Sequence, residues 1–136
     1  PAGIAVTAGG ISATVTTGSV SIGTTDAAFA AGSSVRAVST TGSVAISITQ
    51  TVAYAGHITV TGTSTTGGVG FTFNRGGGIA ARVSSAVTTG SVNPDTTKYT
   101  GSSNALLYAP DEATYNAASM TFLVTLQSTT GSIDLR

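Results

Sequence analysis

Few side chains of this 136-residue chain can do acid–base or nucleophilic chemistry. There are five acidic residues, five basic residues, one histidine and no cysteine. His57, at the start of an expected strand, is the one side chain that titrates near neutrality without help from its surroundings. Serine is abundant, but no Gly-x-Ser-x-Gly turn presents a serine nucleophile. We therefore predict no catalytic residue, and we expect His57 to lie at a strand edge or in a turn.

The acidic residues and the glycine run give no ligand-binding motif. Only Asp111 and Glu112 are adjacent, and no calcium-loop pattern surrounds any acid. Gly76, Gly77 and Gly78 lack the lysine and the following helix of a phosphate-binding loop. We predict no metal and no cofactor, and we interpret residues 73–79 as a β-hairpin with its glycines in the turn.

The composition excludes whole classes of function. Five scattered cations and a net charge of zero cannot build the basic surface of a nucleic-acid-binding protein. A folded monomer of this mass exposes roughly 6,400 Å². The surface would then carry one charge per about 640 Å², a far lower density than on small domains that stay separate in solution. So sparse a charge favours a surface that is largely shared with other subunits.

Period-2 alternation of apolar residues predicts strands from end to end. Val44–Ile48, Val69–Phe73 and Met120–Leu126 are the plainest examples, and β-branched residues are abundant. No apolar run is long enough to span a membrane, and the only expected helix is a short turn at residues 110–115. We predict one all-β domain over residues 1–136, built as an antiparallel β-sandwich or jelly roll.

A short repeat punctuates the strands. Thr-Thr-Gly-Ser-Val or a close variant begins at Thr16, Thr40, Thr65, Thr88 and Thr129, at intervals of about 24, 25, 23 and 41 residues. In each copy the glycine permits a turn and the β-branched residue restarts a strand. A hairpin-pair spacing in a sandwich explains such intervals. The alternative is a short β-helix with one repeat per coil, although the last interval is too long for a regular coil.

The N-terminal segment, residues 3–15, is apolar, alternating and uncharged. A free strand of this kind is an aggregation hazard on a monomer, so proteins that keep one normally pair it with another chain. We predict that it acts as a donor or swapped strand, or else forms the first strand of its own sheet. The predicted assembly interface consists of Ile4, Val6, Ile11, Ala13 and Val15.

These features together resemble self-assembling β-sandwich subunits of fimbriae and extracellular filaments. The resemblance rests on three general features, which are a terminal donor-like strand, a Ser/Thr/Gly-rich sandwich and a strong C-terminal strand at Met120–Leu126. It implies a non-enzymatic structural subunit at the cell surface, whose partners are copies of itself. Many such pilins contain a disulfide, which this cysteine-free chain lacks.

Two alternatives remain at this point. A virion structural protein, such as a capsid-decorating, shell or tail-tube subunit, fits the near-zero charge and a start at Pro1 after removal of an initiator methionine. Removal of a leader peptide before Pro1 would instead fit the extracellular filament. A ligand-binding β-sandwich module is the second alternative, although the chain has no tryptophan to stack on a sugar.

Overall fold

The computed structural model describes residues 5–6, 10–26, 28–29, 32–54, 56–102, 105–108 and 112–136. Most of these residues lie in strands, and the single described helix, α1 (Glu112–Ala117), is short. The predicted all-β class is therefore confirmed. The helix lies close to its expected position at 110–115, of which residues 110 and 111 are outside the described part.

The strands form two main sheets and one minor sheet. The first main sheet contains, in spatial order, β11 (Thr100–Ser102), β12 (Ala105–Tyr108), β9 (Ile79–Thr89), β13 (Met120–Thr130), β7 (Gly56–Thr66), β5 (Ser34–Thr41) and β2 (Ile11–Thr17). The second contains β10 (Val92–Pro94), β14 (Ile133–Leu135), β8 (Val69–Arg75), β6 (Val44–Gln50) and β3 (Val20–Thr25). The minor sheet pairs β1 (Ala5–Val6) with β4 (Ala28–Phe29).

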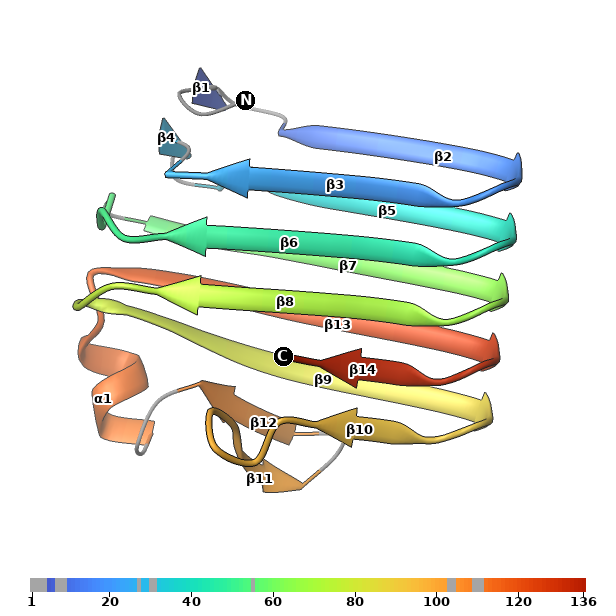
Figure 1. The fold of residues 1–136 in the computed structure, drawn as a ribbon. Helices are drawn as coiled ribbons and strands as arrows, with labels where there is room; N and C mark the ends of the chain where they lie inside the picture. Colours follow the sequence, from blue (N-terminus) through green and yellow to red (C-terminus); the bar gives the residue numbers. More distant parts are fainter. Residues whose placement is uncertain are drawn as a thin grey trace.

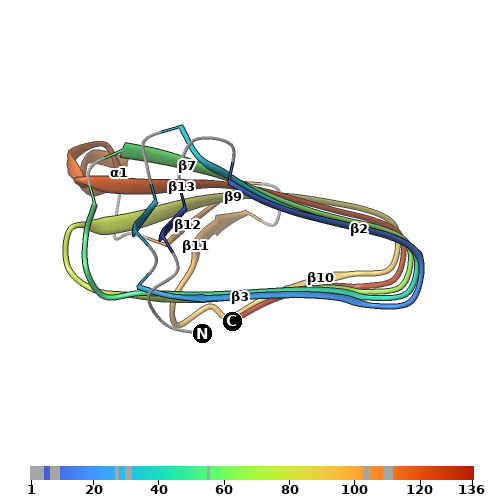
Figure 2. The same cartoon turned by 90° about the horizontal axis from the view of Figure 1, so that it is seen from above.

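The direction of the strands differs from the antiparallel sandwich that the sequence suggested. Within each main sheet the strands pair in parallel, apart from the antiparallel pairs β11–β12 and β12–β9. The reason is that strands adjacent in sequence, such as β2 and β3, lie in opposite sheets and form one flattened coil (Figures 1 and 2). The same reason overturns the hairpin at residues 73–79, because β8 and β9 belong to different sheets. The β-helix alternative describes this pairing better.

The coils are not stacked in sequence order. In space the coils run β2–β3, β5–β6, β7–β8, β13–β14 and β9–β10, so the last coil of the chain lies between the third and the fourth (Figure 1). The chain forms β11, β12 and α1 before it returns to make this coil. That detour explains the long final interval of the repeat.

The core lies between the two sheets and consists of the inward-facing residues of every coil. The alternating burial of β3, β6 and β8 matches the period-2 pattern of their sequences. Phe73 lies at its centre, with ring centroids 5.1 Å from Phe122 and 5.3 Å from Tyr108. Among the described residues, no helix is long and apolar enough to cross a membrane.

Candidate functional site: the open end of the coil stack

The five Thr-Thr-Gly turns stack on one another along one side of the molecule, where the two sheets meet (Figure 2). Their glycines all have positive φ, from +115° at Gly18 to +144° at Gly90. Each turn also hydrogen-bonds to the next: Gly18 N–H donates to Thr41 O at 2.8 Å, and Gly67 N–H donates to Thr130 O at 2.8 Å. The repeat therefore marks the corner of every coil and carries the parallel pairing from one sheet into the other.

The stacked glycines are in closer contact than any other residue type would allow. A Cβ atom on Gly42 would lie 2.1 Å from the carbonyl oxygen of Gly18, and one on Gly67 would lie 2.3 Å from that of Gly42. The glycines of the next two coils in space behave in the same way: a Cβ on Gly131 would lie 2.3 Å from the carbonyl oxygen of Gly67, and one on Gly90 would lie 2.1 Å from that of Gly131. Gly18 is the exception, because a Cβ on it would meet nothing within 4 Å. The Cα of Gly18 thus faces a position that a glycine carbonyl fills in every other coil.

A ladder of buried serines supports the same corner. Ser39, Ser64 and Ser128 each donate a hydrogen bond of 2.8–2.9 Å from Oγ to the glycine carbonyl of the adjoining coil. All three are at most 3% exposed, so the hydroxyl groups need these acceptors. At the equivalent positions of the two outermost coils, β2–β3 and β9–β10, the chain has Val15 and Val87. The sequence carries this signal as Ser-Thr-Thr-Gly in the three middle coils. The five-residue repeat begins one residue later and therefore does not include this serine.

The first coil leaves an open edge on both main sheets. β2 and β3 are the terminal strands of their sheets, and no described strand pairs with their outer edges. Gly18 N–H points inward to β5, and backbone groups alternate sides along a strand, so those of Ala13 and Val15 face the open edge. The apolar side chains of Ile11, Ala13 and Val15 pack only partly against the core here. An edge with free donors, free acceptors and apolar side chains is a template for another strand.

The opposite end of the stack is partly covered by β11, β12 and α1. β12 pairs antiparallel with Ala81–Val83 of β9, β11 pairs with β12, and α1 packs against β9. Arg82 lies over the ring of Tyr115 in α1, with its guanidinium carbon 4.6 Å from the ring centroid. Burial, chiefly, raises the pKa of Tyr99 in this cap well above its ordinary value of 10.0. The two ends are therefore unlike: one carries β11, β12 and α1, and at the other both main sheets end at β2 and β3, beside the minor sheet of β1 and β4 (Figure 1).

The structure distributes the predicted interface residues over two elements. Ile11, Ala13 and Val15 lie in β2, which pairs in parallel with β5 of the same chain. Val6 lies in β1 and pairs with Phe29, and its side chain is outside the described part. Ile4 is also outside the described residues. The described residues thus place part of the predicted interface along the open edge.

Three of the ionisable side chains, His57, Asp26 and Asp95, hydrogen-bond with threonine residues. His57 Nδ1 hydrogen-bonds with Thr121 Oγ1 on the adjacent strand. Thr51 donates to Asp26 from its backbone N–H at 2.6 Å and from its hydroxyl, and these bonds lower the pKa of Asp26 below 3.8. Asp95 accepts hydrogen bonds from the hydroxyl and backbone N–H of Thr97, which lower its pKa as well. The described residues contain no group of three or more acidic or histidine side chains that could hold a metal ion.

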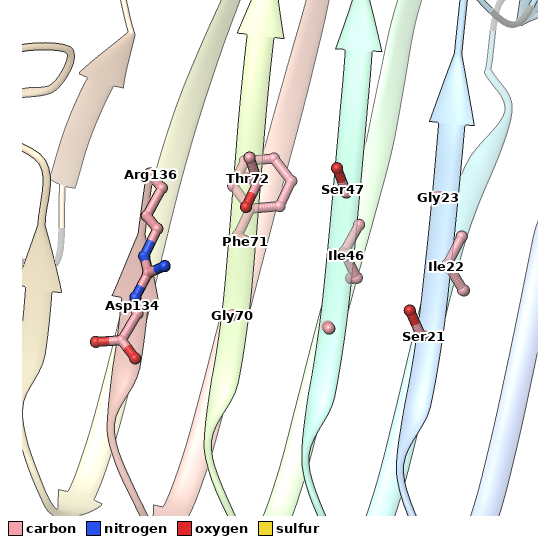
Figure 3. Close-up of a pocket in the computed structure, with 11 residues that line it drawn as sticks. Ser21, Ile22, Gly23, Ile46, Ser47, Gly70, Phe71, Thr72, Asp134 and Arg136 are labelled. Carbon is pink, nitrogen blue, oxygen red and sulfur yellow. The ribbon is translucent and has the colours of Figure 1, made fainter.

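The outer face of the second main sheet carries a shallow groove of about 210 Å³ (Figure 3). Small side chains from three adjacent strands line it, among them Ser21, Ser47 and Thr72. Asp134 and Arg136 lie at one side of the groove, at the C-terminal end of the chain. Asp134 is held by Asn93, whose Nδ2 donates to it at 2.9 Å. Among the described residues that line the groove, no aromatic ring stands out to stack on a ligand, since Phe71 is buried in the core.

Comparison with known proteins shows a likeness in fold. No protein-family model matches the sequence, and no curated protein matches it. A solved structure described as that of a "putative cell adhesion protein" from Clostridium sporogenes ATCC 15579 matches with a TM-score of 0.61. The two sequences are 10% identical over an alignment that covers 91% of this chain and 54% of that one. The chain thus spans about half the length of that protein and is similar to it in fold.

Proposed function

We propose that this chain is a non-enzymatic structural subunit that assembles with copies of itself into an extracellular, cell-surface filament through inter-subunit β-strand pairing. The observation that carries the proposal is the open end of the stack, where β2 and β3 end both sheets with no described strand beside them. A strand from a second copy that pairs there would continue the hydrogen-bond ladder and cover the partly exposed core.

The geometry of the corner supports a stacked contact. In four of the five turns the carbonyl oxygen of the neighbouring glycine packs against the glycine Cα. The corresponding position beside the Cα of Gly18 is open space. A carbonyl from a second copy would fit this space as the internal ones do. The opposite end offers an edge as well, because β10 ends its sheet and β12 covers only Ala81–Val83 of β9. Contact between two unlike ends is heterologous, and repetition of such a contact gives an open filament.

The low charge and the structural likeness support the setting. Ten charged residues in 136 give little repulsion between copies, which suits a subunit that is mostly surrounded by others. The Clostridium sporogenes protein of similar fold is described as a "putative cell adhesion protein", which supports a place at the cell surface.

A lysine on the open edge tests the proposal. Thr14 is exposed on β2, and the register Thr14–Val38–Thr63 places Thr63 in the same row on the internal strand β7. Thr14→Lys puts a long charged side chain at the edge, a device that natural edge strands use to block pairing. Thr63→Lys adds the same charge to the same outer face away from the edge.

We expect negative-stain microscopy to show filaments for the wild type and for Thr63→Lys. For Thr14→Lys we expect a loss of at least tenfold in filament mass, with the far-UV circular dichroism of the folded chain retained. Unchanged filaments in Thr14→Lys, or an equal loss in both folded variants, would show that the open edge is not the interface.

A further inference from the structure

The C-terminal coil occupies a slot that the rest of the chain builds. β13 pairs in parallel with β7 on one side and with β9 on the other, in ten register pairs each. β14 lies in the same way between β8 and β10. All four neighbours precede the coil in sequence, so residues before the coil supply both sides of the slot (Figure 1).

The slot depends on its occupant. The residues that the coil contributes to the core are each at most 1% exposed: Met120, Phe122, Val124, Leu126, Ile133 and Leu135. On either side they contact buried residues, such as Ile58 on β7 and Ala81 on β9, which are register partners of Phe122. An empty slot would expose both of these faces to water and would leave two rows of backbone groups without partners. The slot must therefore be filled, but the contacts do not require the filling coil to come from the same chain.

The connection to the coil is long. Asp95 to Ser119, 25 residues, separates β10 from β13. Extended chain spans about 3.3 Å per residue, so even half of this connection could bridge roughly 40 Å. The coil could thus reach a neighbouring copy. Exchange would retain every contact within the slot, which is the condition under which identical subunits swap elements. It would draw α1 away from β9, because only residues 118 and 119 separate α1 from β13.

We propose that residues 120–135 are exchanged between copies, so that the slot between β7–β8 and β9–β10 of one copy accepts the C-terminal coil of another. The proposal deepens the proposed self-assembly and rests on it, but it names a different contact from the open edge. It also relocates the donor segment, which the sequence suggested at residues 3–15, to the other end of the chain.

Because the natural chain has no cysteine, single cysteines can report the exchange. Ala86 on β9 and Gln127 on β13 are register partners, and both are exposed on the outer face. Ser84 is exposed on the same face of β9, but it is the partner of Thr125. Two residues of offset along a strand place Ser84 and Gln127 about 8 Å apart, which is too far for a disulfide.

Full-length chains carrying Ala86→Cys and Gln127→Cys are co-expressed, purified together and oxidised, and the products are separated without reductant. Exchange predicts a disulfide between the two kinds of chain, at least fivefold more abundant than for Ser84→Cys with Gln127→Cys. A chain that carries both Ala86→Cys and Gln127→Cys establishes that this pair can close. If that chain closes only within itself and the co-expressed pair links no better than the Ser84 control, exchange is refuted.

The failures of the two proposals are distinguishable. Filaments that are blocked by Thr14→Lys but contain no Ala86–Gln127 link would leave the open edge as the interface and would overturn the exchange. A selective link in filaments that Thr14→Lys does not affect would support the exchange and would overturn the open edge.

Discussion

Replacing Gly67 by alanine tests whether contact between glycines holds the coils in register. Gly67 has a φ of +135°, and a Cβ on it would lie 2.3 Å from the carbonyl oxygen of Gly42. Gly18 has a φ of +115° in an equivalent turn, but a Cβ there would meet nothing within 4 Å. Both alanines incur the cost of an unfavourable backbone conformation, about 1–3 kcal/mol. The difference between the two variants therefore isolates the contact between coils.

The magnitude of that difference follows from what must move. The carbonyl oxygen has to shift by at least about 0.7 Å to reach even the closest separation that real Cβ atoms show. The shift weakens two hydrogen bonds of 2.8 Å that join the coils of Gly42 and Gly67, from Gly42 N–H to Thr66 O and from Ser64 Oγ to Gly42 O. Each such bond contributes about 1 kcal/mol, so with the lost packing Gly67→Ala should lower the free energy of unfolding by about 2–3 kcal/mol more than Gly18→Ala.

Urea unfolding followed by far-UV circular dichroism measures the difference. Both variants should carry Thr14→Lys, so that assembly does not contribute to the stability of either one. With a slope of about 1.5 kcal/mol/M, the midpoint of Gly67→Ala should lie about 1.5 M below that of Gly18→Ala. Equal midpoints would refute the reasoning, since backbone conformation alone would then account for both losses.

Three further predictions concern hydrogen bonds and titration. Ser64→Ala removes a buried hydrogen bond to the Gly42 carbonyl, so urea unfolding should show a loss of about 1–2 kcal/mol in the free energy of unfolding. Ser84 is exposed, and Ser84→Ala should change that free energy by less than about 0.5 kcal/mol. Similar losses in the two variants would contradict a stabilising role for the buried serines. Hydrogen bonds from Thr51 lower the pKa of Asp26, so the stability that the carboxylate adds is present above pH 3.8 and is lost as pH falls through its folded-state pKa. Asp26→Asn should therefore make the free energy of unfolding fall less steeply with decreasing pH. An unchanged pH dependence would show that Asp26 does not contribute to acid unfolding. Burial raises the pKa of Tyr99, so the stability that the neutral side chain adds is present below pH 10 and is lost as pH rises through the folded-state pKa. The variant Tyr99→Phe should therefore resist alkaline unfolding better than the wild type. At neutral pH the variant should be at least as stable as the wild type, because the buried hydroxyl has no hydrogen-bond partner in the described structure.

Strand positions could be read from the sequence because the physics that sets them is local. The alternation at Val69–Phe73 and Met120–Leu126 predicts strands, and both segments are strands with a buried face. Strand direction is not local in this sense. Thr40-Thr41-Gly42-Ser43 is compatible with a hairpin or with a change of sheet, and only the glycine contacts with the neighbouring coils show that the second occurs.

The position of the last coil could not be inferred from its sequence. Its Ser128-Thr-Thr-Gly corner is the same as that of the coils at Ser39 and Ser64, so nothing in the repeat places it between the third and fourth coils. The site was partly predictable for a related reason. The position of Ile11, Ala13 and Val15 in an edge strand could be expected from an apolar segment near the start of the sequence. The open space beside the Cα of Gly18 depends on how all five coils stack.

The central claim is that subunits associate through the open end of the stack, and sedimentation velocity over a range of protein concentrations tests it most directly. We predict that the wild-type chain forms species that grow with concentration and exceed closed dimers, with the 13.2 kDa monomer prevailing only on dilution. A single 13.2 kDa species up to millimolar concentration would contradict the claim.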